Sequence, residues 1–473
     1  MKTYKKVYLY KLGRFQEDFE YLFPNIKIKN YIVDDNKRVY NKKTCIKLNK
    51  LKKDKTLIVI CDRKNEKTTK KLNKLGFIEN KNYMYLEDFG TILDKPIQKK
   101  SAETINKFKK TYNIELGNYS IKNSQLLKKM IYTEQEHNLD CHEPFRYAQI
   151  EPNGLIYPCC PVLIDEPLGS ILFDSPKNIW NSTRAKLIRL SIINKTYAFC
   201  NLEYCRLKDI NEATSERDNS LIASKIPEYT VISYDQSCNL KCRSCRTCNI
   251  NNNSSDKHQI LNSTITKKLL NSSWLNKTKQ LVMATQGEVF FSNTYKNILF
   301  SKKLKNLNTL IIHTNATLLS PKKLNKLCEH CEKQNIKCLI LNVSVDSANK
   351  ETYEKLRCGA NFDILKKNLT GISQARKEGK FYTINMITVL QRDNYEELPD
   401  IAKFAIELGF DRLDVQLISN WGTFTNEEFK KISMMDENGR ILPELQKILR
   451  DPIFKSEKIE FVGSVFKREK YMD

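Results

Sequence analysis

The fold and chemistry of this sequence are indicated above all by one stretch, Cys238-Asn239-Leu240-Lys241-Cys242-Arg243-Ser244-Cys245. Its C-x3-C-x2-C spacing places three thiols in a single tight loop. The loop follows a short β-branched run, Thr230–Ser233, which predicts a strand, so the thiols lie at the carboxyl end of that strand. Three thiolates on a four-iron cluster leave one iron without a protein ligand, and such an open position can bind a small molecule.

Strand and helix patterns alternate on both sides of this loop, from residue 226 to about residue 430. Right-handed crossovers between parallel strands curl such a sheet, which predicts an open (β/α)6 partial TIM barrel. Active sites in these sheets lie at the carboxyl ends of the strands. The six predicted strands are Thr230–Ser233, Gln280–Ala284, Leu310–His313, Leu339–Val345, Ile384–Val389 and Leu413–Ile418.

Helix start signals support this alternation. Ser320 followed by Pro321 has the pattern of an N-cap with proline at the first helical position. Asn394 with Glu397 three residues later has the pattern of a capping box. The helix that it predicts places Leu398 and Ile401 on its apolar face and ends at Gly409.

Short polar motifs follow the predicted strands in order. Gln286-Gly287-Glu288 follows the second strand, Thr314-Asn315-Ala316-Thr317 the third and Ser344-Val345-Asp346-Ser347 the fourth, with Arg357 a few residues later. With the three cysteines, these motifs resemble those of the radical SAM superfamily. Three positions depart from the family: Gln286, where the family has the first glycine of Gly-Gly-Glu, Ala316, where it has the glycine of Thr-Asn-Gly-Thr, and Ser244, where many members carry an aromatic residue.

The resemblance implies a function for each motif. Cys238, Cys242 and Cys245 would hold a catalytic [4Fe–4S] cluster whose free iron chelates S-adenosylmethionine (SAM). A reductant protein such as flavodoxin or ferredoxin would supply the electron. The resulting 5′-deoxyadenosyl radical would abstract hydrogen from a sugar, peptide or other small substrate. In such enzymes the cofactor supplies the radical and the protein positions the reactants. The residues implied in SAM binding are Gly287, Glu288, Asn315, Ser344, Asp346 and Arg357.

A second group of cysteines lies upstream of the barrel. Twelve residues separate Cys141 from Gly154 and four separate Gly154 from Cys159, a spacing that resembles the start of SPASM/twitch auxiliary-cluster domains. Glu151–Cys160 is predicted to form a hairpin that turns at this glycine. Four thiolates are enough for a fully ligated second [4Fe–4S] cluster, and twitch-like describes this small set best. The expected ligands are Cys141, Cys159, Cys200 and Cys205, without Cys160.

Four domains are predicted along the chain. Residues 1–100 contain short apolar runs and a helical stretch, which indicate a Rossmann-like α/β domain. Residues 101–225 are a connector followed by the auxiliary cluster domain. Residues 226–430 form the barrel, and residues 431–473 form a charged helical tail.

Composition limits the class of protein. The 473 residues include 15 cysteines, and a metal or cluster is the leading use for so many thiols in a reducing compartment. The sequence shows no secretion signal and no apolar run long enough to cross a membrane, so we expect a cytoplasmic protein. The net charge of +25 is spread along the chain, which does not favour a nucleic-acid partner.

Two other classes remain open. One is a zinc-stapled basic protein that binds nucleic acid, because Cys248 extends the cysteine run. The other is a radical SAM relative that has lost catalysis and serves as a scaffold, which Gln286 and Ser244 would favour.

Overall fold

The computed structural model forms two compact units. The first comprises Met1–Arg146 and Ile156–Lys225, and the second comprises Tyr147–Leu155 and Ile226–Asp473. The boundary therefore crosses the upstream cysteine region, and nine of its residues belong with the barrel. The residues described are 6–11, 14–23, 25–34, 39–40, 43–53, 56–89, 110, 122–203, 205, 226–251, 256–463 and 466.

The first unit begins with a mainly parallel sheet. Its strand order is β3-β4-β2-β1-β5-β6, in which only the β3–β4 pair is antiparallel. A buried cluster rich in tyrosine and isoleucine, including Tyr10, Ile58 and Tyr83, forms its core. The elements are β1 (Lys6–Tyr10), α1 (Arg14–Leu22), β2 (Ile28–Val33), β3 (Val39–Tyr40), β4 (Lys43–Lys47), β5 (Thr56–Ile60), α2 (Glu66–Lys74), β6 (Tyr83–Tyr85) and α3 (Leu86–Phe89).

The cysteine-rich part of the first unit packs against this sheet domain. Arg63 donates from Nε to the carbonyl of Ile131 at 3.0 Å, and the Tyr132 hydroxyl donates to Glu87 at 3.0 Å. Most of the predicted connector, residues 101–121 apart from residue 110, lies outside the described residues. The elements here are α5 (Asn123–Tyr132), α6 (Glu143–Arg146), β8 (Leu155–Tyr157), β9 (Gly169–Ser170), α7 (Pro176–Trp180) and α8 (Thr183–Ile193).

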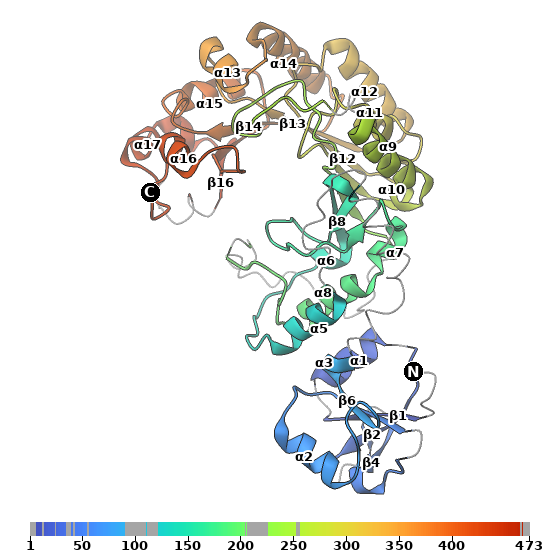
Figure 1. The fold of residues 1–473 in the computed structure, drawn as a ribbon. Helices are drawn as coiled ribbons and strands as arrows, with labels where there is room; N and C mark the ends of the chain where they lie inside the picture. Colours follow the sequence, from blue (N-terminus) through green and yellow to red (C-terminus); the bar gives the residue numbers. More distant parts are fainter. Residues whose placement is uncertain are drawn as a thin grey trace. The chain divides into compact units, whose positions relative to one another are not determined.

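The second unit is built on a parallel sheet with helices on its outer side (Figure 1). The strands of this unit follow the order β16-β15-β14-β13-β12-β11-β10-β7 within a ten-stranded sheet that does not close on itself, so the barrel is open. All six predicted strands are present. They are β10 (Tyr229–Ile232), β11 (Gln280–Met283), β12 (Thr309–Thr314), β13 (Cys338–Ser344), β14 (Thr383–Leu390) and β15 (Arg412–Leu417).

The crossovers between these strands are helical, as predicted. Ser320 occupies the N-cap position of the helix that starts at Pro321, although its side chain makes no capping hydrogen bond. The apolar residues Leu398 and Ile401 are buried. The helices are α9 (Asp256–Asn271), α10 (Trp274–Lys277), α11 (Asn293–Leu299), α12 (Pro321–Lys333), α13 (Lys350–Leu356), α14 (Phe362–Lys377), α15 (Leu398–Glu407), α16 (Asn426–Ile432) and α17 (Pro443–Ile448).

Two details of the sequence prediction are wrong. Asn394 does not cap α15, whose N-cap is Glu397, because the Asn394 amide donates to the carbonyls of Asp346 and Val389 instead. The C-terminal tail is not only helical, since β16 (Ile459–Val462) pairs in parallel with β15 and extends the sheet.

The other end of the sheet is extended by β7 (Tyr147–Glu151), which pairs in parallel with β10. Pro152–Gly154 forms the turn after it, and Asn153 and Gly154 both have positive φ, as a tight turn at this glycine requires. The predicted turn is present, but its first strand is also a barrel strand.

Hydrogen bonds identify the two faces of the barrel sheet. Trp274 of α10 donates to Thr230 at 3.0 Å, so Thr230 faces the helix layer. Alternate residues of a strand face opposite sides, so Val231 faces the concave interior, and so does its neighbour in register, Gln149. By the same alternation His313 and Asn342 face the interior, and their side chains lie 3.3 Å apart.

None of the described helices is both long enough and apolar enough to cross a membrane.

Candidate active site

The three cysteines of the C-x3-C-x2-C stretch lie in the loop after β10. Cys238 and Cys242 are buried, whereas Cys245 is exposed. The Cys238 amide donates to the carbonyl of Ile250 at 2.9 Å, and the Cys245 amide donates to the carbonyl of Cys242 at 3.0 Å. The backbone therefore closes the loop at both ends and holds the three thiols on one short segment.

Each of the three sulfur atoms accepts a side-chain N–H, two of them from segments after β12 and after α13 and the third from within the cysteine loop itself. Such donors favour thiolate over thiol, and hydrogen bonds to sulfur tune a bound cluster. The three pairs are Asn315 Nδ2 to Cys238 Sγ at 3.7 Å, Arg357 Nη1 to Cys242 Sγ at 3.9 Å, and Arg246 Nη2 to Cys245 Sγ at 3.3 Å.

Glu288 connects the strand-end loops after β11 and β12. Its carboxylate accepts from the Asn315 amide at 2.7 Å and the Thr314 hydroxyl at 2.8 Å, and its own amide donates to the carbonyl of Ser237 at 2.8 Å. Burial raises the pKa of Glu288 above its usual value, although these hydrogen bonds oppose the shift. Glu288 therefore orders the loops around Cys238, whichever ligand they bind.

Gly287 lies against the backbone of the segment that precedes Cys238. Its φ is +79°, and a Cβ atom placed on it would lie 2.4 Å from the carbonyl oxygen of Asp235 and 2.9 Å from that of Ser237. A side chain at this position would displace the segment that leads to Cys238.

Asn315 is held in place from several sides. Its Nδ2 also donates to Asn239 at 3.1 Å, and its Oδ1 accepts from the amide of Thr317. The next residue, Ala316, has a φ of 55°, which explains why the related family motif has glycine there. Asn368 of α14 donates to the carbonyl of Ala316 at 2.8 Å and stabilises this conformation.

Asp346 and Arg357 form a buried ion pair after β13. Asp346 Oδ2 lies 2.6 Å from Arg357 Nε, and the two side chains are only 2% and 12% exposed. Burial alone would lower the pKa of Arg357, but the Asp346 carboxylate outweighs it and raises the pKa. Since Arg357 also reaches Cys242, the pair connects the fourth strand end to the cysteine loop. Ser344 is the last, half-buried residue of β13.

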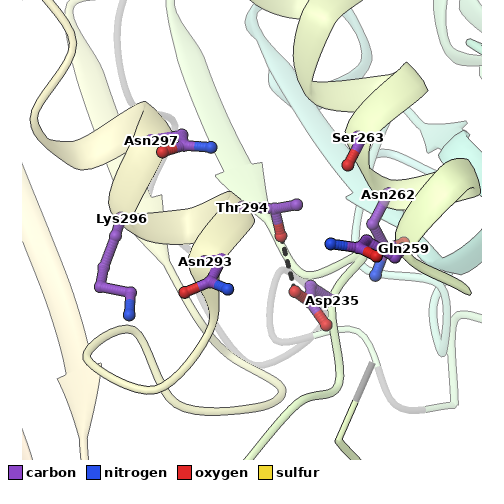
Figure 2. A pocket seen from close by; sticks show the side chains of 8 residues that line it. All are labelled: Asp235, Gln259, Asn262, Ser263, Asn293, Thr294, Lys296 and Asn297. Carbon is purple, nitrogen blue, oxygen red and sulfur yellow. Dashed lines mark hydrogen bonds between the residues drawn. The ribbon is translucent and has the colours of Figure 1, made fainter. Parts of the chain in front are cut away.

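Asp235 anchors the segment before Cys238 (Figure 2). Its carboxylate accepts from the Ser237 amide at 3.0 Å, the Ser292 hydroxyl at 2.5 Å and the Thr294 hydroxyl at 2.6 Å. Burial would raise the pKa of Asp235, but these hydrogen bonds outweigh it and hold the pKa below its usual value. Asp235 also lines a polar cavity of about 370 Å³ between α9 and α11.

Gln286, the departure from the Gly-Gly-Glu motif, has a structural use here. Its amide donates to Glu151 of β7 at 2.9 Å and accepts from Gln236 at 2.7 Å. Glu151 also accepts from Gln149 at 2.6 Å, and burial raises the pKa of Glu151. Gln286 therefore joins the added strand β7 to the loop that leads to the cysteines.

The donor set fits a bound iron-sulfur cluster. Burial raises the pKa of the Cys238 thiol to about 11 and also raises that of Cys242, so iron must displace protons from these thiols. The cationic side chains of Arg246 and Arg357 oppose this shift at Cys238 and Cys242 respectively. Within the described residues, no three histidine, cysteine or acidic side chains are grouped closely enough for a single metal ion.

The upstream cysteines also come together. Burial raises the pKa of Cys200 and of Cys159; nearby Cys141 and Cys205 raise that of Cys200 further, and nearby Cys141 and Cys200 raise that of Cys159 further. Burial raises the pKa of the Cys141 thiol to about 12. Cys160 donates its backbone amide to the sulfur of Cys159 and is not among these electrostatic neighbours.

Four contributors to this site were not predicted from the sequence: Arg246, Asp235, Asn368 and Glu151. Arg246 directly follows the third cysteine, which is the only local signal for it. Asp235, Asn368 and Glu151 have no local signal, because their partners at the site come from distant parts of the sequence.

The cysteine loop follows β10 of a parallel sheet, and the other motifs follow β11, β12 and β13, which is the arrangement that the resemblance to the radical SAM superfamily implies. Comparison with known families agrees. Residues 232–405 match the radical SAM superfamily, and residues 141–206 match the SPASM iron-sulfur cluster-binding domain. The chain thus carries a radical SAM domain, and a SPASM domain precedes it. The two domains imply a [4Fe–4S] cluster and SAM in the radical SAM domain and auxiliary iron–sulfur binding in the SPASM domain, as predicted.

Solved structures show more distant likenesses. SuiB from Streptococcus suis, bound to its precursor peptide SuiA, has 16% identity and a TM-score of 0.35 over 63% of this chain and 57% of that chain. The anSMEcpe protein with bound AdoMet has 20% identity and a TM-score of 0.28 over 40% of this chain and 50% of that chain. TYW1 with a lysine-pyruvate adduct has 12% identity and a TM-score of 0.29 over 46% and 70%. No curated protein matches the sequence.

Proposed function

We propose that this chain is an enzyme that reductively cleaves SAM at a [4Fe–4S] cluster held by Cys238, Cys242 and Cys245, and abstracts hydrogen from a bound substrate. One observation carries the proposal. Hydrogen bonds and an ion pair join Cys238 and Cys242 to the strand ends that bear Glu288, Asn315 and the Asp346–Arg357 pair. When bound, the reduced cluster with SAM supplies the 5′-deoxyadenosyl radical.

The residues of the chain have separate roles in this proposal. The three thiols bind the cluster, and Gly287 allows the close backbone approach that shapes the loop. Glu288, Asn315, Ser344, Asp346 and Arg357 bind and orient SAM.

The carboxylate of Glu288 has room for one more donor. A carboxylate accepts about four hydrogen bonds. Three donors are already in place: the hydroxyl of Thr314 and the amide of Phe290 on Oε1, and the amide of Asn315 on Oε2. The remaining acceptor position, on Oε2, suits the SAM ammonium group.

The interior of the barrel favours a polar substrate. Gln149, Glu151, His313, Asn342 and Asn385 all lie on its concave face, where amide, carboxylate and imidazole groups can bind hydroxyl or amide groups. A sugar, a peptide or another small polar molecule fits this lining. The auxiliary cluster, held by Cys141, Cys159, Cys200 and Cys205, would take up an electron or orient the substrate.

We further propose a domain division, a cellular compartment and a reductant for this protein. The chain has the four predicted domains, the first of them Rossmann-like. In that domain β2 lies on one side of β1 and β5 and β6 on the other, as in a doubly wound sheet. The enzyme acts in the cytoplasm with a flavodoxin or ferredoxin as reductant. The described cysteines are free thiols, as binding of clusters requires.

Metal analysis tests the function. Iron, sulfide and zinc would be measured per chain after anaerobic reconstitution, for the wild type and for a Cys238/Cys242/Cys245→Ala variant. We expect about eight irons in the wild type and about four in the variant, as two [4Fe–4S] clusters require. Incubation with dithionite and SAM should yield 5′-deoxyadenosine from the wild type only.

Two results would contradict this function. Stoichiometric zinc with negligible iron in both proteins would favour the zinc-stapled alternative. A full iron content without 5′-deoxyadenosine, with SAM and reductant present, would favour a scaffold that has lost catalysis.

A further inference from the structure

Arg246 directly follows the third cysteine and is hydrogen-bonded to the cysteine loop through both its side chain and its backbone. It is 9% exposed, and its Nη2 donates to Cys245 Sγ at 3.3 Å. Its Nη1 donates to the carbonyl of Gln236 at 2.8 Å, and its backbone amide donates to the carbonyl of Cys242 at 3.0 Å. The guanidinium group therefore bridges the segment before the first cysteine and the third cysteine itself.

The charge of Arg246 is not neutralised by a carboxylate. Within the described part of the chain it forms no ion pair, and Cys245, Cys238 and Cys242 are the groups that raise its pKa against the effect of burial. Arg357, the other arginine at the loop, differs because Asp346 lies 2.6 Å from it.

This arrangement has an electrostatic consequence. Reduction of a cluster adds one negative charge to it, and a nearby cation stabilises the more negative state. The guanidinium group stays protonated at every working pH, and its burial limits screening by salt and water. Hydrogen bonds to the sulfur ligands are among the factors that set the reduction potentials of these clusters.

We propose that Arg246 is a positioning residue that raises the reduction potential of the catalytic cluster and so widens the range of reductants that can deliver its electron. The proposal rests on the proposed function, since it requires a cluster on Cys238, Cys242 and Cys245. One electron passes from the reductant protein to the cluster, and no bond or proton is exchanged in this step.

The same loop offers a matched control. Arg243 lies three residues earlier, and its exposed side chain pairs with Glu428 at 2.7 Å and lies over the ring of Phe424. Arg243→Gln and Arg246→Gln each remove one positive charge from the same loop. Only Arg246→Gln removes a buried charge at a cluster sulfur.

The experiment is an EPR-monitored redox titration of the reconstituted full-length enzyme without SAM. The auxiliary signal is assigned with the Cys238/Cys242/Cys245→Ala variant and subtracted. We expect Arg246→Gln to make reduction of the catalytic cluster about tenfold less favourable, a shift of about 59 mV to lower potential for a one-electron couple. Arg243→Gln should keep the wild-type potential. Arg246→Lys should fall between the two, because lysine keeps the charge but not the two-pronged contact.

An unchanged potential in Arg246→Gln, or an equal shift in Arg243→Gln, overturns the proposal. A purely structural role for Arg246 would lower iron content and leave the potential of the remaining clusters unchanged. If Arg246→Gln does not hold the cluster, Arg246→Lys decides, and a wild-type potential in that variant overturns the proposal. Absence of iron from the wild type would instead contradict the proposed function itself.

Discussion

Substitution of Gly287 by alanine tests whether the strand-end loop depends on close backbone contact. Two costs are expected. A non-glycine residue at a φ of +79° costs about 1–2 kcal/mol. The added Cβ would lie 2.4 Å from the carbonyl oxygen of Asp235, and relieving such overpacking costs about 1–3 kcal/mol more. The total is about 2–5 kcal/mol of unfolding free energy.

The clash is not easily relieved because both opposing atoms belong to the backbone. The second contact, at 2.9 Å, is the carbonyl oxygen of Ser237, which also accepts the Glu288 amide. Any shift that relieves the clash therefore moves the residue before Cys238. We expect Gly287→Ala to bind less iron at the catalytic cluster, in addition to its lower stability.

Gly379 supplies the matched control. It ends α14 with a φ of 71°, and a Cβ placed on it meets no described atom within 4 Å. Gly379→Ala should therefore carry only the conformational cost of about 1–2 kcal/mol and keep full iron content. The assay is urea unfolding of both variants, followed by tryptophan fluorescence, together with iron analysis. Equal losses of stability in the two variants, with unchanged iron in both, would refute the steric argument.

Two further predictions concern other groups. Burial lowers the pKa of His313 to about 4, so the unfolded chain takes up a proton from about pH 6.5 downward while the folded chain does not. The unfolding free energy should fall by about 1.6 kcal/mol more in the wild type than in His313→Gln between pH 6.5 and pH 5 in urea titrations, and parallel curves would exclude this origin. For the auxiliary site, Cys159→Ala should lose about four irons per chain while Cys160→Ala keeps them, and the opposite result would make Cys160 the ligand.

The positions of the motifs in the fold could be predicted from the sequence because each motif is local. The spacing of Cys238, Cys242 and Cys245 is written in eight consecutive residues. Each later motif directly follows a strand, and parallel strands bring their carboxyl ends to one edge. Glu288 and Asn315 therefore had to meet near the cysteines, and the structure joins them by a hydrogen bond of 2.7 Å.

What the sequence did not predict depends on partners far along the chain. The pairing of β7 with β10 joins segments about eighty residues apart. The short apolar pattern of β7 predicts a strand but does not indicate which strand it pairs with. Asn394 shows the same limit. Its spacing from Glu397 suits a capping box, but the carbonyl of Asp346, 48 residues away, is the partner that its amide takes.

The departures from the family motifs have different physical consequences. Ala316 keeps the left-handed backbone that its family motif assigns to glycine, and Asn368 holds that conformation through the carbonyl of Ala316. Gln286 does more than replace a glycine, because its side chain fills a position between Gln236 and Glu151 that glycine would leave without a hydrogen-bonding group. Loss of this side chain would leave one oxygen of the buried Glu151 carboxylate without its donor, at a cost of about 1–3 kcal/mol. Gln286 is therefore better explained by the extra strand β7 than by loss of catalysis, since the neighbouring Gly287 and Glu288 keep the backbone approach and the hydrogen bonds of the site.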